Sequence, residues 1–263
     1  MFCVFSADMY KLFRRKSFYV FLLCSAVLVC FIAYFTPTFI KLSFGLSPNA
    51  EIDVVKLLNV NAFYFLNSGV EIMYTIITST FIAMFLAYEF SSNGIERMLI
   101  RGVSRFKIYF SKIFSSCCIA TIFLLLNTLS GFFSGWYFFG LGEFNQNSFL
   151  GSLRIIGFYE LSLITFCFVL VMLAFLIKKT SPLIIAVLAC FMAVPPCLVY
   201  LDNLIKMWFN VEIISGNYWF VHLFHGMNFT SKESIILYSI ACLSYVVVSC
   251  LVGVCFLKRQ EYW

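Results

Sequence analysis

The ionisable residues of this 263-residue chain lie between six long apolar stretches or close to the ends of those stretches. A helix crosses a bilayer core with roughly 20 apolar residues, and each stretch is long enough to do so. A charge at mid-bilayer costs about 2.5–3.5 kcal/mol on insertion scales. The pattern therefore predicts an all-α membrane protein with no intramembrane group that carries protons. The six predicted transmembrane helices are Ser17–Ile40, Ser68–Tyr88, Ile113–Phe139, Ile155–Ile177, Ser181–Leu201 and Ser234–Leu257.

Composition supports one membrane domain over residues 1–263. The chain is 62% hydrophobic and 11% charged, whereas soluble domains average about 25% charged. We expect an interfacial helix at 1–16, a six-helix membrane domain at 17–257 and a tail at 258–263. The eleven cysteines lie mostly in apolar stretches without a CxxC pair, so neither a disulfide framework nor a metal site is predicted.

The distribution of Lys and Arg predicts the orientation. Thirteen of them fall in the N-terminal segment, the second and fourth connections and the C-terminal tail, against five in the opposite loops. The positive-inside rule then places both termini in the cytoplasm. This topology also explains the net charge of +6, so we do not expect a nucleic-acid partner. Glu71 and Glu160 each stand 18 residues, about 27 Å of helix, from an inner-face residue, which predicts that both lie near the outer face.

Two cytoplasmic segments have amphipathic character. In the first, apolar residues recur at helical spacing at Phe2, Phe5, Met9, Leu12 and Phe13. This predicts a helix on the cytoplasmic leaflet, serving either as a membrane anchor or as a docking element for a partner.

The second segment is the connection 89–112. Ser92 and Asn93 can cap a short helix that Gly102 can end, and Ser104 can cap the next helix. One face of the short helix is apolar and the other is charged. Such a helix can transmit a push from a soluble partner, or it can be a basic loop that sets topology. The apolar face contains Ile95, Met98 and Leu99, and Glu96, Arg97 and Arg101 project elsewhere.

The outer connection Leu201–Lys232 follows Pro195-Pro196, which should break the fifth helix near its outer end. Its aromatic residues predict short re-entrant helices in the outer leaflet. His222 and His225 can share a helical face there, but two histidines without a third ligand indicate interfacial polar residues rather than a metal site.

A polar stripe runs along the second predicted span. It recurs at i, i+4, i+8 and i+11 or i+12, and it either lines a path through the membrane or bonds to a neighbouring helix. Its members are Asn67, Glu71, Thr75 and either Thr78 or Ser79.

Two segments resemble the permease subunits of type-2 ABC exporters. They are "YEFSSNGIERMLIRGVSRFKIYFSK" at Tyr88–Lys112 and "ADMYKLFRRKSFYVFLL" at Ala7–Leu23. Ile95 departs from the pattern, because the family commonly has Thr there. The matching positions in the first segment are Glu89, Gly94, Leu99, Ser104, Arg105, Ile108, Ser111 and Lys112.

The resemblance implies a subunit of a bacterial plasma-membrane exporter that pairs with an identical or a different permease and binds a cytoplasmic ABC ATPase. It implies that the N-terminal helix and the short helix contact that ATPase, and that the second and fifth spans flank the path. The chain has no Gly-Lys dipeptide and thus no phosphate-binding loop, so we expect ATP and Mg on the partner and no cofactor here. The residues implied in ATPase coupling are Glu89, Glu96, Arg97, Arg101 and Arg105.

The function predicted from the sequence is therefore export of an amphipathic or hydrophobic substrate, with a bacteriocin or antimicrobial peptide, for export or self-protection, as first choice. Two other classes stay open. An ion-coupled carrier or channel would normally need midplane carboxylates. An intramembrane enzyme would need a motif such as HExxH, which is absent from this sequence.

Overall fold

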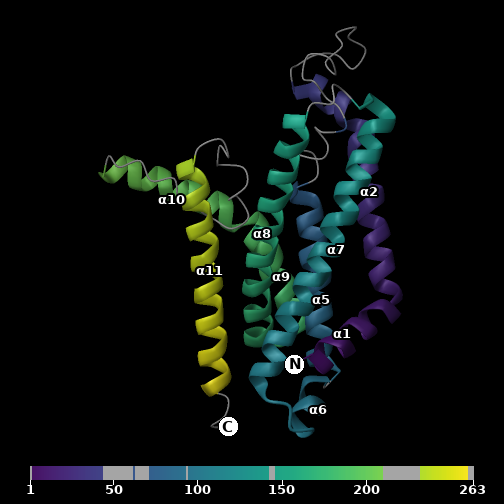
Figure 1. Cartoon of the computed structure of the whole chain (residues 1–263). Coiled ribbons are helices and arrows are strands. Elements are labelled where there is room, and N and C mark those ends of the chain that lie inside the picture. The colour runs from purple at the N-terminus through teal and green to yellow at the C-terminus, as the bar shows by residue number, and fades with distance from the viewer. Residues whose placement is uncertain are drawn as a thin grey trace. The chain divides into compact units, whose positions relative to one another are not determined.

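The computed structural model describes residues 2–43, 62, 71–92, 94–141, 146–209 and 232–259. Every regular element within these residues is an α-helix, which confirms the predicted all-α class (Figure 1). The helices are α1 (Phe2–Arg14), α2 (Lys16–Ser43), α5 (Glu71–Ser91), α6 (Gly94–Ile100), α7 (Arg105–Phe139), α8 (Gln146–Ile177), α9 (Thr180–Met192), α10 (Val194–Phe209) and α11 (Lys232–Arg259).

The chain divides into two compact units. Unit 1 comprises Met1–Arg14, Thr78–Ala120 and Phe158–Trp263, and unit 2 comprises Arg15–Ile77 and Thr121–Gly157. Three of the long helices, α5, α7 and α8, contribute to both.

Among the residues that the structure describes, four helices are long and apolar enough to cross a membrane, so the protein is a multi-pass membrane protein. They contain the predicted first, third, fourth and sixth spans. A fifth candidate is the pair formed by α5 and α6, which bend by 53° at the break between them. The described part of the predicted second span, Glu71–Tyr88, lies in α5, and the chain turns away after α5 as α6.

The predicted fifth span, Ser181–Leu201, is not one continuous helix. α9 ends at Met192 and α10 begins at Val194, so the break at Ala193 falls inside the predicted span. At 13 residues α9 is shorter than the roughly 20 residues that a straight crossing needs. The two prolines lie in the first turn of α10, where a missing N–H is tolerated. A sixth span stays a prediction, and the re-entrant helices predicted after α10 lie outside the described residues, as do His222 and His225.

Aromatic packing holds α2 against α7 in unit 2. Phe18 is buried edge-on against Phe123, with ring centroids 6.0 Å apart. Further along the two helices Tyr34 meets Phe138 at 5.6 Å. Leu23 of α2 is exposed, as expected for a side chain that meets lipid tails.

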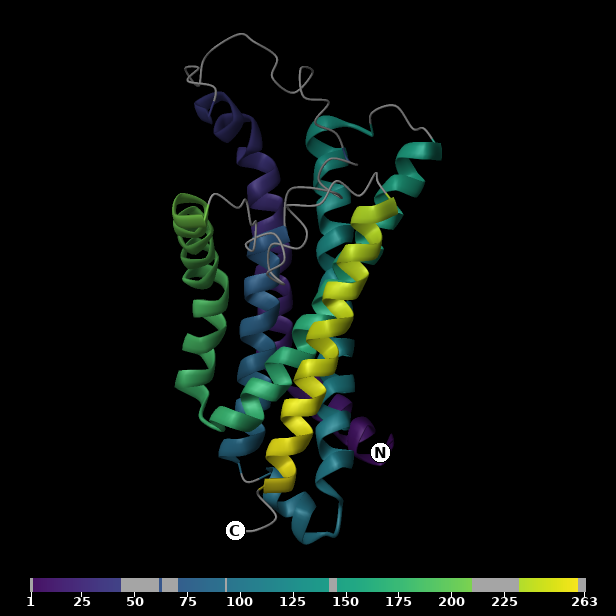
Figure 2. The ribbon, with the colours of Figure 1, turned by 90° about the vertical axis from the view of Figure 1, so that its left-hand side faces the viewer.

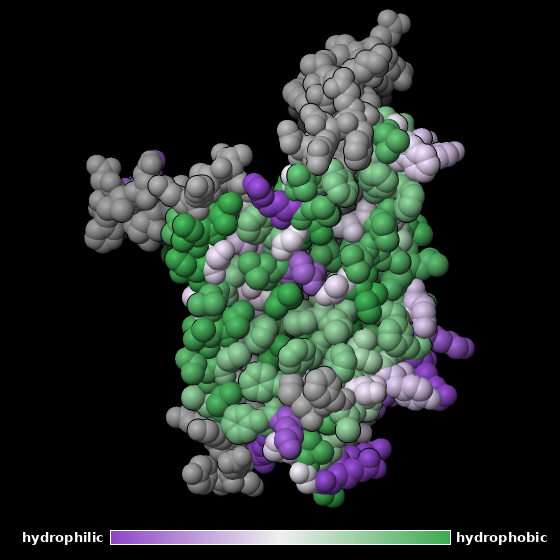
Figure 3. Space-filling model, in the orientation of Figure 1, coloured by the Kyte–Doolittle hydropathy of each residue, from purple (hydrophilic) through white to green (hydrophobic). Residues whose placement is uncertain are grey.

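Unit 1 gathers helix ends that the charge pattern predicts to be cytoplasmic. Figures 1 and 2 show α1, α6 and the C-terminal end of α11 toward the same end of this unit. The space-filling view shows hydrophilic residues around α6 at its lower end, whereas hydrophobic residues dominate the face above (Figure 3). The buried charged side chains of unit 1, Asp8, Glu89 and Lys112, lie on α1, α5 and α7.

Candidate functional site

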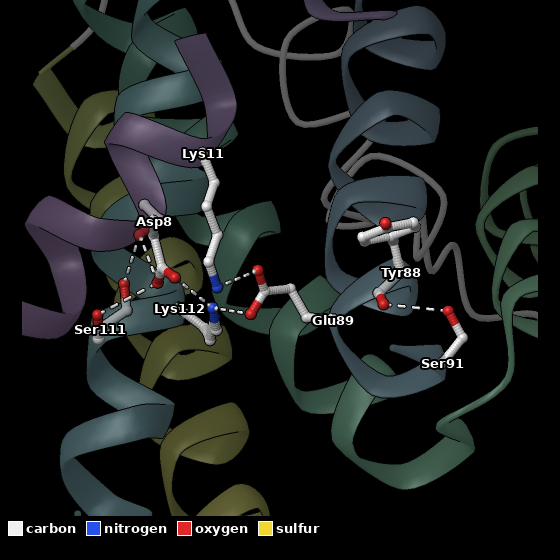
Figure 4. A network of polar contacts seen from close by, with 8 residues as sticks. Asp8, Lys11, Tyr88, Glu89, Ser91, Ser111 and Lys112 are labelled. Atoms are coloured by element: carbon white, nitrogen blue, oxygen red, sulfur yellow. Dashed lines mark hydrogen bonds and ion pairs between the residues drawn. The ribbon is translucent and has the colours of Figure 1, made fainter. Parts of the chain in front are cut away.

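Four charged side chains from α1, α5 and α7 form a buried ion cluster in unit 1 (Figure 4). The Lys112 ammonium lies at its centre, 2.7 Å from Asp8 Oδ1 and 2.7 Å from Glu89 Oε2. Lys11 Nζ reaches Glu89 Oε1 at 3.2 Å. The ion cluster is defined here as Asp8, Lys11, Glu89 and Lys112.

The ion cluster is removed from water apart from Lys11. Asp8 and Lys112 are fully buried and Glu89 is 2% exposed, while the side chain of Lys11 is 44% exposed. Its two carboxylates and two ammonium groups cancel in formal charge. Because a buried charge is tolerated only when it is paired and hydrogen-bonded, this neutrality is what allows the cluster to exist.

Two serines of α7 complete the environment of Asp8. The Ser115 hydroxyl lies 3.3 Å from Asp8 Oδ2, and Ser111 Oγ lies 3.5 Å from the same oxygen. Ser115 Oγ also lies 2.9 Å from the carbonyl of Ser111 in its own helix. Burial raises the pKa of the Asp8 carboxyl above its usual range, and the nearby Lys112 ammonium opposes that rise.

The sequence brings these groups together through helical spacing. Asp8 and Leu12 are four residues apart on α1, and both are buried, so they share the face of α1 that packs inward. On α7 the residues Ser111, Lys112 and Ser115 fall within one helical turn and are likewise buried. Glu89 comes near the end of α5, where the N–H of Ser92 bonds to the carbonyl of Tyr88 at 2.9 Å.

Gly94 places the start of α6 directly against the ion cluster. A Cβ atom at this position would lie 3.2 Å from the Glu89 carbonyl oxygen and 3.4 Å from Glu89 Oε2. A side chain at this position would require its neighbours to move by a few tenths of an ångström. The first residue of α6 is therefore in contact with the carboxylate that Lys112 holds.

The other end of α6 follows the prediction. Gly102 adopts a left-handed φ of +80°, and its N–H bonds to the carbonyl of Leu99 at 2.9 Å. The N–H of Val103 bonds to the carbonyl of Met98 at 3.1 Å. These two bonds are the pair expected when glycine ends a helix in this way. α7 then begins at Arg105, directly after Ser104.

The structure separates the residues predicted for ATPase coupling into two groups. Glu89 is buried in the ion cluster, whereas Glu96, Arg97 and Arg101 are exposed on or next to α6. Arg105 is half-buried at the start of α7. Ile100 is 86% exposed beside the charged residues of α6, which makes this helix an apolar and charged protrusion.

The predicted polar stripe is only partly described. Asn67 and the side chain of Glu71 lie outside the described residues. Thr75 is half-buried, and Thr78 is fully buried with no hydrogen-bond partner for its hydroxyl among the described residues. Neither the path-lining role nor the interhelical bond predicted for these residues is tested by this geometry.

Asp8 and Lys112 were not predicted as members of a functional site. A signal for Asp8 is present in the sequence, because it is a carboxylate on the otherwise apolar face of an amphipathic helix. Lys112 stands at the start of an apolar stretch between Ser111 and Ser115. Their partnership crosses 104 residues of sequence, which helical periodicity alone does not connect.

Within the described part of the chain, no group of three or more His, Cys, Asp or Glu residues is arranged to hold a metal ion. The site is thus a set of interhelical ion pairs next to an exposed helix. Such a set can join helices so that they move together, and the exposed helix can receive a force from another protein.

A family model described as "ABC-2 family transporter protein" matches residues 4–196. The match runs from α1 into α10 and takes in the whole ion cluster and α6. No curated protein matches the chain.

Proposed function

The chain belongs to the ABC-2 transporter family, and from this premise we propose that it is the permease subunit of an ATP-driven exporter. It is a membrane subunit of an ABC transporter, and the family implies an ABC ATPase partner. Export as the direction of transport rests on the resemblance of the two cytoplasmic segments to type-2 exporters.

The observation that carries the proposal is the contact between the ion cluster and α6. Lys112 joins α7 to α1 through Asp8 and to α5 through Glu89, and Gly94 packs against Glu89. A force applied to α6 therefore reaches α5 and α7 through a short, desolvated set of contacts. Because packed, paired groups do not deform gradually, displacement of α6 would shift these helices together.

The exposed side of α6 supports a docking role. Glu96, Arg97 and Arg101 offer both signs of charge, and Ile100 offers an apolar contact. Mixed charge around an exposed apolar side chain suits a protein surface. In the proposed mechanism ATP and Mg remain on the ATPase, and closure of two ATPases pushes α6 and reorients two paired permeases.

The proposed substrate class rests on the resemblance to type-2 exporters and on the apolar character of the spans. We propose an amphipathic or hydrophobic substrate, with an antimicrobial peptide or bacteriocin as first choice. Asn67, Glu71, Thr75 and Thr78 of the second predicted span are proposed to line its path. The second permease, identical or different, would complete that path in a bacterial plasma membrane, with both termini cytoplasmic.

The test is ATP-driven transport in proteoliposomes that contain the permease, its ATPase and a fluorescent cationic amphipathic peptide. Replacing Glu96 and Arg97 together by Gln should reduce peptide transport per ATP hydrolysed about tenfold, since the loss of two interface charge contacts is worth on the order of 1–2 kcal/mol. Arg154→Gln is the control, because Arg154 is exposed on α8 and predicted on the outer side. Unchanged coupling in the double variant would contradict the role of α6.

A further inference from the structure

Tyr109 of α7 connects the base of that helix to α11 through an unusually close contact. The Tyr109 side chain is fully buried, and its hydroxyl donates to the backbone carbonyl of Ser249 at 3.2 Å. These two residues are 140 positions apart in sequence. Both belong to unit 1, and α11 is the helix that follows the long outer connection.

Gly253 provides the space for this contact. A Cβ atom at position 253 would overlap the Tyr109 hydroxyl and would lie 2.6 Å from ring atom Cζ. No real Cβ contact is that short, so any side chain larger than glycine must push the ring away. In a helix the carbonyl of Ser249 is also the regular acceptor for the N–H of Gly253. The phenol therefore adds a second donor to a carbonyl that the helix itself uses.

The Tyr109 ring is also held from the side of α8. Its centroid lies 5.2 Å from that of Phe175, with the rings inclined by 74°. Phe175 in turn meets Phe90 of α5 at 5.1 Å and 85°. Phe90 directly follows Glu89 of the ion cluster. Edge-to-face aromatic contacts of this kind fix ring positions as well as burying area.

We infer that Tyr109 is a positioning residue that makes α11 move as one body with α5, α7 and α6 during transport. This inference rests on the proposed function. The bond from Tyr109 joins α11 to α7, and a second bond, from the Tyr238 hydroxyl to the carbonyl of Phe158 at 2.7 Å, joins α11 to α8. Loss of the first bond would leave α11 held by α8 and let it lag behind α7. Two contacts of Tyr109 hold α11: the hydrogen bond from its hydroxyl to Ser249 and the packing of its ring against Gly253. Separate substitutions can remove each contact.

The test measures a distance between the start of α7 and α11 in the complex of permease and ATPase, by spin labels at Lys107 and Leu251. Both positions are exposed. The labels are introduced through an unnatural amino acid, because the chain has eleven cysteines. In the unmodified sequence we expect one narrow distance that is the same without nucleotide and after trapping with ATP and vanadate.

Two variants should break this behaviour. Gly253→Ala should broaden the distribution and make it change with nucleotide, and Tyr109→Phe should do the same to a smaller extent. Transport of the fluorescent peptide per ATP should fall about fivefold in Tyr109→Phe, the ratio that corresponds to one net hydrogen bond. Gly157→Ala is the matched control, because a Cβ atom there meets nothing within 4 Å.

A double variant separates positioning from folding. Tyr109→Leu with Gly253→Ala removes the overlapping ring atoms, so thermal stability should recover relative to Gly253→Ala alone. Coupling should not recover, since the bond to Ser249 is still absent. Coupling that recovers in parallel with stability would overturn the inference, and so would distances in all variants equal to those of the unmodified complex.

The outcome also distinguishes this inference from the proposed function. A complex that hydrolyses ATP and transports peptide, with α11 distances unaffected by Tyr109→Phe and Gly253→Ala, contradicts only the role of Tyr109. A chain that retains no ATPase contradicts the proposed function and the inference together.

Discussion

The ion cluster and α6 contain the same kinds of charged residue in opposite surroundings. In the ion cluster the charges of Asp8, Glu89 and Lys112 are buried and satisfy one another. On α6 and just after it, Glu96, Arg97 and Arg101 are exposed. The two regions touch where Gly94 meets Glu89.

This difference assigns different tasks to the two regions. Removing one member of a buried, paired set leaves another charge without a partner in a medium of low dielectric constant, which costs several kcal/mol. Exposed charges contribute little to stability and remain available to another protein. The ion cluster is therefore expected to hold helices together, and α6 is expected to receive the partner.

Lys112→Met is expected to have the largest effect on the free energy of unfolding. This change leaves the carboxylates of Asp8 and Glu89 buried without their shared cation and should lower the free energy of unfolding by about 3–5 kcal/mol. Thermal denaturation of the detergent-solubilised protein, followed by size-exclusion chromatography, measures this loss.

The matched control is Lys107→Met on the same helix, where the lysine is exposed. Its effect should stay within about 0.5 kcal/mol. Equal stability of the two variants would show that the ion cluster does not hold α1, α5 and α7 together.

Gly94→Ala tests the contact between the two regions. The added Cβ would lie 3.2 Å from the Glu89 carbonyl oxygen, so the start of α6 must move by a few tenths of an ångström. We expect a loss of about 1 kcal/mol from this crowding. Gly151→Ala in α8 meets nothing within 4 Å and should instead stabilise, since alanine favours helix by up to about 1 kcal/mol. The same sign in both variants would contradict the close packing at Gly94.

Acidification tests whether the pKa of Asp8 in the ion cluster is raised. The pKa of Asp8 is raised by burial from an ordinary 3.8, so the folded state binds a proton more readily than the unfolded chain does. Proton binding by Asp8 therefore adds to the free energy of unfolding. This contribution is fully present below pH 3.8, the ordinary pKa, and is lost as pH rises through the raised pKa of the folded state. We compare the melting temperatures of the unmodified chain and of Asp8→Asn from neutral pH to about pH 4. As pH falls, the melting temperature of the unmodified chain should rise relative to that of Asp8→Asn. A constant difference would mean that the Asp8 pKa is not raised.

The smallest expected effect on stability comes from replacing Glu96 and Arg97 together by Gln. Both are exposed, so the melting temperature should change by less than the equivalent of about 0.5 kcal/mol. The same variant should have reduced coupling in proteoliposomes. A destabilisation as large as that of Lys112→Met would remove the contrast between the two regions.

The sequence was sufficient to predict those parts of the structure that depend on a local pattern of residues. Within the described residues, four long apolar stretches are helices that can cross a membrane, and Gly102 ends α6 as predicted, with a left-handed backbone. These features depend on hydrophobic length and on one residue's backbone freedom, both of which can be read from neighbouring residues.

Long-range pairing could not be predicted in the same way. Asp8 and Lys112 meet only because α1 packs against α7, and no local periodicity encodes that meeting. The division of the predicted fifth span is a different case. Pro195 and Pro196 indicated a break, and the break falls at Ala193, two residues before Pro195.

We propose that this permease takes its motive force from a separate ATPase that docks on α6. Purification of the tagged chain from its native membrane in mild detergent, with analysis of the co-eluting proteins and of ATP hydrolysis, tests this dependence. We expect a cytoplasmic ABC ATPase in the eluate, and its loss when Glu96, Arg97 and Arg101 are all replaced by Ala. Solute transport by the purified chain alone, driven by a proton or ion gradient, would contradict it.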